Sequence, residues 1–186
     1  MKAVMNVHWD IAEHWHHCRL PVSAVFATDD AYAAFYTSKY LIQDTAEAIF
    51  AHLDRGFSKD PMAAYLEFWG VMQAIFIQQD AICELYESVF GTKAATHGLN
   101  AWATLRALRN RCAGHPANKT IGGGSLRSFM GRGFGPYERI TYEQYDSSTR
   151  TMTHPTFNLK ALINSYDAEA ARLLSAVLAE MKRKCP

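Results

Sequence analysis

The chain has 186 residues, of which 49% are hydrophobic and 20% charged, a balance typical of one globular domain. The formal net charge is +1 at pH 7, and no apolar run is long enough to span a bilayer, so we expect no integral membrane protein. Charged residues and histidines interrupt the first 19 residues, so we also expect no secretory signal. Cys18, Cys83, Cys112 and Cys185 form no C-x-x-C pair and predict reduced thiols in a cytoplasmic protein.

Residues 1–27 predict a helical extension that is rich in histidine. His14 and Cys18 are four residues apart and could reach one metal ion from a single helix face. Glu13 and His16 have the spacing found in di-iron bundles, but that architecture needs a second such pair, which the sequence lacks. We therefore expect neither a metal nor a cofactor, and interpret the segment as an amphipathic helix packed on the bundle.

Two long helices follow this extension. Thr28, with two aspartates after it, predicts a helix start, and an apolar stripe continues to about Leu53 before Gly56 ends it. Pro61 in a first turn opens a helix of about 30 residues, which ends at Gly91 and is long enough to span a domain.

Three polar residues, Gln78, Gln79 and Asp80, interrupt the apolar pattern in the middle of the second long helix. In one interpretation they face solvent. In the other, Asp80 or Gln79 accepts a hydrogen bond from Arg109 on the next helix, because a partly buried arginine needs acceptors. Asp80 is the better candidate, since a carboxylate can accept two hydrogen bonds from one guanidinium.

The next apolar pattern predicts a helix over residues 99–108 that carries Arg109 at its end. On an unbroken α-helix, Arg109 and His115 would be rotated by about 240° from each other and would face different sides. Gly114 and Pro116 are stop signals, so the helix is predicted to end at Gly114. His115 is then free to lie beside Arg109, and this pair of residue types suits chemistry at a phosphodiester.

The segment Arg109-Asn110-x4-His115 resembles the R-x4-6-H signature of HEPN domains, and residues 76–81 add to the likeness. The resemblance covers roughly residues 29–116 and the last helix. It implies a helical bundle that dimerises with two such motifs facing each other. Many members are metal-independent endoribonucleases of toxin, phage-defence or RNA-processing systems, whereas others bind without cutting. It further implies that His115 acts as general acid or base, Arg109 stabilises the phosphorane and Asn110 orients one of them.

The charge distribution is uneven, because residues 88–137 contain seven Lys or Arg residues and no Asp or Glu. Around the motif, this basic segment predicts a surface for RNA. The alternatives are a solvated positive face or the binding site of an acidic partner protein. The candidate RNA-binding residues outside the motif are Arg106, Arg111, Lys119, Arg127 and Arg132.

Residues 120–157 predict an insertion made of a Gly-rich loop and a small antiparallel β-hairpin, with room for a third strand. Tyr142, Tyr145 and His154 are candidate substrate contacts within it. Asn158 then predicts the N-terminus of the last helix.

The sequence thus predicts one mostly α domain over residues 1–186, a bundle of four or five helices with a small β-hairpin before the C-terminal helix. The favoured function is a metal-independent endoribonuclease that cuts RNA as a homodimer, with room for an antitoxin or another regulatory partner and without a membrane. Two alternatives remain open: a non-catalytic nucleotide- or protein-binding module, and a structural dimerisation domain in which Arg109 caps carbonyls and His115 is packed.

Overall fold

The computed structural model describes residues 1–114, 119–121 and 124–186. For residues 119–121 and 124 it describes the backbone only. The described chain is mostly helical with a small strand region before the last helix, so the predicted fold class is confirmed. The helices are α1 (Lys2–His17), α2 (Val22–Val25), α3 (Asp29–Arg55), α4 (Pro61–Phe90), α5 (Asn100–Arg109), the π-helix η1 (Asn110–Gly114) and α6 (Leu159–Lys184).

Local sequence signals set the ends of the long helices. The side chain of Thr28 accepts a hydrogen bond in the first turn of α3, Asp60 accepts two in the first turn of α4, and Asn158 accepts one in the first turn of α6. Gly56 and Gly91 follow the last residues of α3 and α4 with φ of 77° and 70°, a region that costs glycine little. The predicted helix starts at Thr28 and Asn158, and the stops at Gly56 and Gly91, are confirmed.

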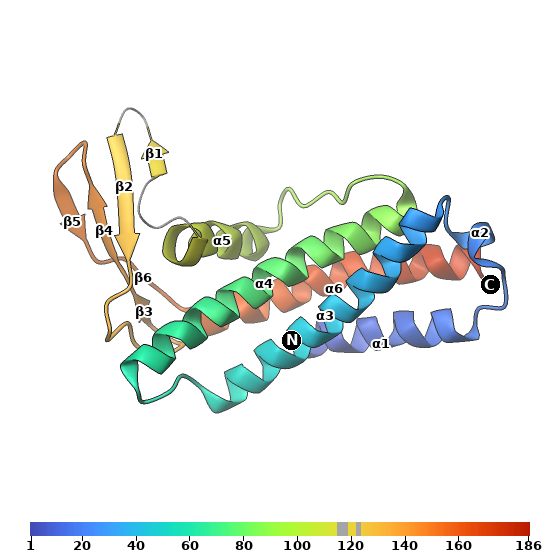
Figure 1. Ribbon diagram of the computed structural model, residues 1–186, viewed down its shortest axis with the longest axis horizontal. Helices are drawn as coiled ribbons and strands as arrows, with labels where there is room; N and C mark the ends of the chain where they lie inside the picture. Colours follow the sequence, from blue (N-terminus) through green and yellow to red (C-terminus); the bar gives the residue numbers. More distant parts are fainter. Residues whose placement is uncertain (115–118, 122–123) are drawn as a thin grey trace.

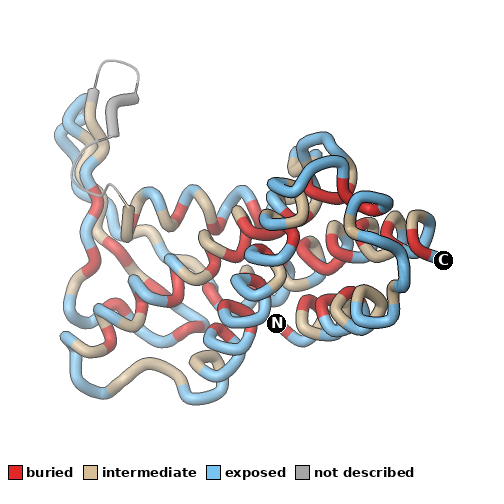
Figure 2. The backbone as a smooth tube through the Cα atoms, turned by 45° about the vertical axis from the view of Figure 1, so that its right-hand side comes forward, coloured by how far each residue is buried: buried red, intermediate tan, exposed pale blue. Residues whose placement is uncertain are grey.

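Helices α3 and α4 form a long antiparallel hairpin, and α6 packs along α4 (Figure 1). Helix α1 packs on α6 and α3, and α5 packs on α6 and α4. Buried positions follow the inner faces of these helices (Figure 2), and the fully buried side chains include Phe35, Phe68 and Tyr166. Burial of each of the two phenylalanine side chains stabilises the fold by about 1.5–3 kcal/mol relative to exposure. Within the described residues, no helix combines the length and the apolarity needed to cross a bilayer.

Two carboxylates of α6 cap the N-termini of other helices. Asp167 accepts hydrogen bonds of 2.9 and 3.0 Å from two backbone N–H groups in the first turn of α1. Glu169 accepts hydrogen bonds from the backbone N–H groups of Ala101 and Trp102, at 3.1 and 2.8 Å, in the first turn of α5. Both satisfy donors that have no partner inside their own helix. Glu169 therefore fixes the orientation of the helix that carries Arg109.

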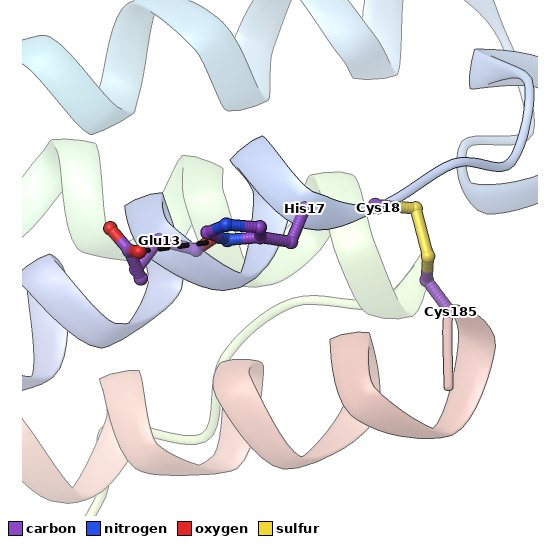
Figure 3. The surroundings of a disulfide bond; sticks show 4 residues. All are labelled: Glu13, His17, Cys18 and Cys185. Carbon is purple, nitrogen blue, oxygen red and sulfur yellow. Dashed lines mark hydrogen bonds and ion pairs between the residues drawn. A yellow bond between two sulfur atoms is a disulfide. The ribbon is translucent and has the colours of Figure 1, made fainter.

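A disulfide joins the C-terminal ends of α1 and α6, between Cys18 and Cys185 (Figure 3). Cys83 and Cys112 are free. The prediction that all four cysteines are reduced is therefore wrong for the first and last of them, because the parallel packing of α1 on α6 brings their two C-terminal ends, 167 residues apart in the sequence, into contact. The predicted cytoplasmic location rested on reduced thiols and loses that support.

The histidine-rich end of α1 does not offer the ligand pair considered from its sequence. Cys18 is bonded to sulfur and has no thiolate to give a metal ion, which leaves His14 without its proposed partner. His17 points back along the helix toward Glu13, whose carbonyl oxygen lies 2.9 Å from its Nδ1 (Figure 3). In the described part of the chain, no three His, Cys, Asp or Glu side chains gather to hold an ion.

The insertion is larger than the predicted hairpin and forms two antiparallel sheets. One has the strand order β1-β2-β4-β5, and the other pairs β3 with β6. The four-stranded sheet rises from one end of the bundle beside α5 (Figure 1). The strands are β1 (Lys119–Ile121), β2 (Gly124–Phe129), β3 (Ile140–Thr141), β4 (Glu143–Asp146), β5 (Thr151–Thr153) and β6 (Thr156–Phe157).

A buried hydrogen bond ties the loop before β3 to the α3–α4 hairpin. The hydroxyl of Tyr137 lies 2.6 Å from Nδ1 of His52, and its ring stacks on Phe57 at 4.4 Å between centroids. Burial raises the pKa of Tyr137 and lowers the pKa of His52, so the phenol stays protonated and donates a hydrogen bond to a neutral imidazole. Glu67 lies 3.4 Å from the other ring nitrogen. This contact places the insertion relative to the bundle.

Candidate functional site

Arg109 is the last residue of α5, and its guanidinium lies over α4. Its Nη2 and Nε donate to Oε1 of Gln73 at 2.9 and 3.3 Å, and its Nη1 donates to Oδ1 of Asn110 at 3.1 Å. Its Cζ lies 4.1 Å from the centroid of the Phe76 ring. These hydrogen-bond acceptors are neutral amides, so they hold the guanidinium in place without neutralising its charge. An arginine held in this way can still bind a phosphate.

Asp80 pairs with Arg106 and not with Arg109. Its Oδ1 accepts from Nη2 of Arg106 at 2.7 Å, and Cζ of Arg106 lies 4.3 Å from the centroid of the Phe76 ring. This pairing follows from the antiparallel directions of α4 and α5. Because the two helices run in opposite directions, a residue farther along α5 lies opposite an earlier residue of α4. Arg109 thus lies opposite Gln73, about 10 Å along α4 from Asp80. The predicted hydrogen bond from Arg109 to Asp80 is therefore wrong. Asp80 instead forms an ion pair with Arg106, which offsets much of the positive charge of Arg106.

Gln78 and Gln79 are fully buried, so neither faces solvent, and their side-chain hydrogen bonds go to residues other than Arg109. Nε2 of Gln79 donates to the carbonyl oxygen of Trp102 at 3.0 Å, which links α4 to α5. Nε2 of Gln78 donates to the hydroxyl of Thr45 at 3.1 Å and so links α4 to α3. Both amides position helices, and Gln79 acts on Arg109 only through the placement of α5.

The chain beyond Arg109 widens into the π-helix η1, Asn110–Gly114. The predicted helix stop at Gly114 and Pro116 falls where the described residues break off, so it stays a prediction. In a π-helix, residues five positions apart are neighbours on successive turns. Gly114 is five residues after Arg109 and therefore lies next to it. A Cβ atom built on Gly114 would stand 2.7 Å from Nη1 and 3.2 Å from Cζ of Arg109. The guanidinium therefore packs against the bare backbone of the last residue before His115. His115 itself lies outside the described residues.

Two further residues of η1 have structural roles. Nη1 of Arg111 donates to the hydroxyl of Tyr142 at 2.7 Å, and the Tyr142 ring is buried. Tyr142 thus holds the insertion to η1 and is not open to a substrate, contrary to its prediction as a contact. Cys112 is buried, and burial raises the pKa of its thiol to about 12, which keeps it protonated and rules it out as a nucleophile at neutral pH.

The insertion presents the remaining basic candidates. Arg127 and Arg132 are exposed, and Tyr145 is half-buried opposite Arg127 in the register of β2 and β4. His154 is also exposed. Lys119 begins β1, and its side chain is outside the described part of the chain. Of the basic candidates, Arg127 on β2 and Arg132 in the turn after it are exposed, whereas Arg106 and Arg111 are engaged by Asp80 and Tyr142.

No family model, no curated protein and no solved structure matches this chain.

Gln73 is the site residue that the sequence did not single out. A signal was present, because Gln73 continues an exposed stripe on α4 at alternating spacings of four and three residues, through Met62, Leu66 and Trp69. The same spacing reaches Phe76 and then Asp80. Only the packing of α5 shows that the polar member of this stripe meets Arg109.

Proposed function

We propose that the protein is a metal-independent endoribonuclease of HEPN type that acts as a homodimer. The observation that carries this proposal is the guanidinium of Arg109, which two amide oxygens and the bare backbone of Gly114 hold at the surface. Its positive charge is uncompensated by these contacts and stands at the point where the chain continues to His115. A fixed cation next to a titratable imidazole is what phosphodiester cleavage requires.

In the mechanism that the HEPN resemblance implies, the RNA 2′-oxygen attacks the adjacent phosphorus. A bond forms between the 2′-oxygen and phosphorus, and the bond from phosphorus to the 5′-oxygen breaks, which leaves a cyclic phosphate and a 5′-hydroxyl. His115 would move a proton as general base or acid, and Arg109 would stabilise the extra negative charge on the phosphorane. Asn110 would orient Arg109, to which its Oδ1 is already bonded.

The homodimer is supported by the exposed stripe of α4. Met62, Leu66 and Trp69 repeat at spacings of four and three residues, the pattern by which one helix packs along another. The stripe continues to Gln73 beside Arg109, so a two-fold contact along it would bring two motifs together. Two copies supply two histidines and two arginines, enough for a base, an acid and a cation at one phosphate.

The exposed arginines of the insertion extend this site into an RNA surface. If Arg127 and Arg132 contact RNA, affinity should fall with salt, with a log–log slope of roughly −0.7 per phosphate neutralised on a single strand. The double charge reversal Arg127→Glu and Arg132→Glu should weaken binding and leave the thermal transition unchanged, since both side chains are exposed. An unchanged RNA affinity would remove the sheet from the RNA surface.

The decisive experiment is cleavage of total RNA in excess EDTA by the wild type and by two variants, Arg109→Ala and His115→Ala. We expect cleavage by the wild type and its loss in each variant, with circular dichroism spectra unchanged. A mixed dimer of the two variants should recover part of the activity if one site draws on both chains.

Equal cleavage by all three proteins would contradict the assignment of the site. RNA binding that depends on Arg109 without any cleavage would instead favour the non-catalytic binding module. Cleavage at full rate by a strict monomer would contradict the shared site.

A further inference from the structure

A groove of about 540 Å³ runs between α3 and α4 and opens beside Arg109. Gln73 and Phe76 line it, and both also contact Arg109. The groove is thus a direct continuation of the proposed phosphate site. Its volume lies in the range of pockets that hold small organic ligands.

The walls of the groove suit a flat ring. Ala34, Ser38 and Ala81 are small residues along it, which leaves space between the two helices. Phe76 and Ile77 provide an apolar wall from α4. The guanidinium groups of Arg106 and Arg109 lie over the Phe76 ring, at 4.3 and 4.1 Å from its centroid, so an aromatic surface and cations meet at one end. Nucleobases stack on such surfaces regardless of their identity.

Charges of opposite sign stand at the two ends of the groove. Arg109 lies outside the lining, beside Gln73, at one end, and Glu84 lines the groove at the other, eleven residues or about 16 Å farther along α4. Asp80 lies between them and is paired with Arg106. Asp30 of α3 is a further carboxylate in the lining. Phe76, Asp80 and Glu84 are four residues apart in succession and share one face of the helix. A ligand that fits this gradient has a phosphate at one end and hydrogen-bond donors at the other.

We propose that this groove binds the nucleobase next to the phosphate held by Arg109, and that it selects guanine through Glu84. This inference rests on the proposed function, because it places an RNA phosphate at Arg109. Guanine presents two adjacent donors, N1–H and the 2-amino group, which match the two oxygens of one carboxylate. Uracil and thymine offer a single N–H, and adenine and cytosine place an acceptor nitrogen beside their amino group, where a carboxylate would repel it.

The direct test is equilibrium binding of mononucleotides that the protein cannot cleave, measured by calorimetry in EDTA at low salt. The probes are 2′-deoxyguanosine 3′-monophosphate, its deoxyinosine analogue, which lacks the 2-amino group, and thymidine 3′-monophosphate. We expect the guanosine nucleotide to bind about tenfold more tightly than the thymidine nucleotide, as one good base contact provides. The inosine nucleotide should bind with intermediate affinity.

Two variants and their matched controls locate the contact. Glu84→Gln should remove most of the preference for guanine, while Glu87→Gln, an exposed change outside the groove lining on the same helix, should keep it. Ala34→Leu narrows the groove and should weaken all three nucleotides, whereas Ala51→Leu at an exposed position of α3 should not.

Equal affinities for the three nucleotides, or an unchanged preference in Glu84→Gln, would overturn the inference. If RNA cleavage in EDTA still depended on Arg109 in that case, the ribonuclease proposal would stand while the groove lost its role. Loss of dimerisation in Ala34→Leu without any change in nucleotide binding would assign the groove to a second copy of the chain and would also overturn the inference.

Discussion

Replacing Gly114 with alanine should displace Arg109 without unfolding the protein. The added methyl group would stand 2.7 Å from Nη1 and 3.2 Å from Cζ of Arg109, closer than carbon and nitrogen atoms approach each other without a bond. The atoms in conflict are at the tip of a flexible side chain, so the guanidinium moves and the backbone stays. Its hydrogen bonds to Gln73 at 2.9 and 3.3 Å are then lost.

The expected magnitudes separate stability from activity. Alanine is favoured over glycine in a helix by about 1 kcal/mol, and the lost hydrogen bonds at the surface cost about the same. The free energy of unfolding should therefore change by less than about 1 kcal/mol. Cleavage should fall about 100-fold, since a displacement of roughly 1 Å at a reacting group has that effect.

The assay pairs urea unfolding, followed by circular dichroism, with single-turnover RNA cleavage in EDTA. Gly70→Ala is the matched control, because a Cβ at Gly70 on α4 would meet no atom within 4 Å. It should gain stability and keep full activity. Wild-type cleavage by Gly114→Ala would refute the role of Arg109, and a strongly destabilised variant would refute the argument that only the side-chain tip must move.

Three further predictions concern the frame around the site. The free energy of unfolding should fall by the same amount, up to roughly 5 kcal/mol for so long a closed loop, in Cys18→Ser, in Cys185→Ser and in the double variant. Unequal losses among the three variants would argue against the disulfide. The denatured, unreduced protein should show two reactive thiols, from the free cysteines. Burial lowers the pKa of His8, so the unfolded chain takes up the proton first and stability should fall as the pH drops below about 6.5; His8→Gln, which can still donate to the Lys39 carbonyl, should flatten that slope. Glu169→Ala should cost about 1 kcal/mol and speed amide exchange at the start of α5, and unchanged exchange there would contradict its capping role.

Local signals in the sequence were sufficient for most of the helices. Thr28 and Asn158 at the starts, and Gly56 and Gly91 at the ends, act on their own neighbours through side-chain caps and backbone freedom, so they can be identified without the fold. The insertion was located by its glycines and alternating residues, but the pairing of its strands depends on long-range hydrogen bonds, which is why a hairpin was predicted where two sheets form.

The sequence by itself placed Arg109 in the last turns of a helix and predicted a stop at Gly114, because caps, glycine and proline act within a turn. Only the tertiary structure decided what Arg109 touches. The antiparallel packing of α5 on α4 places Arg109 against Gln73 and Arg106 against Asp80. No local sequence pattern fixes the offset of one helix along the other. The disulfide between Cys18 and Cys185 could not be predicted from the sequence for the same reason. It depends on two helix ends that meet only when α1 packs on α6.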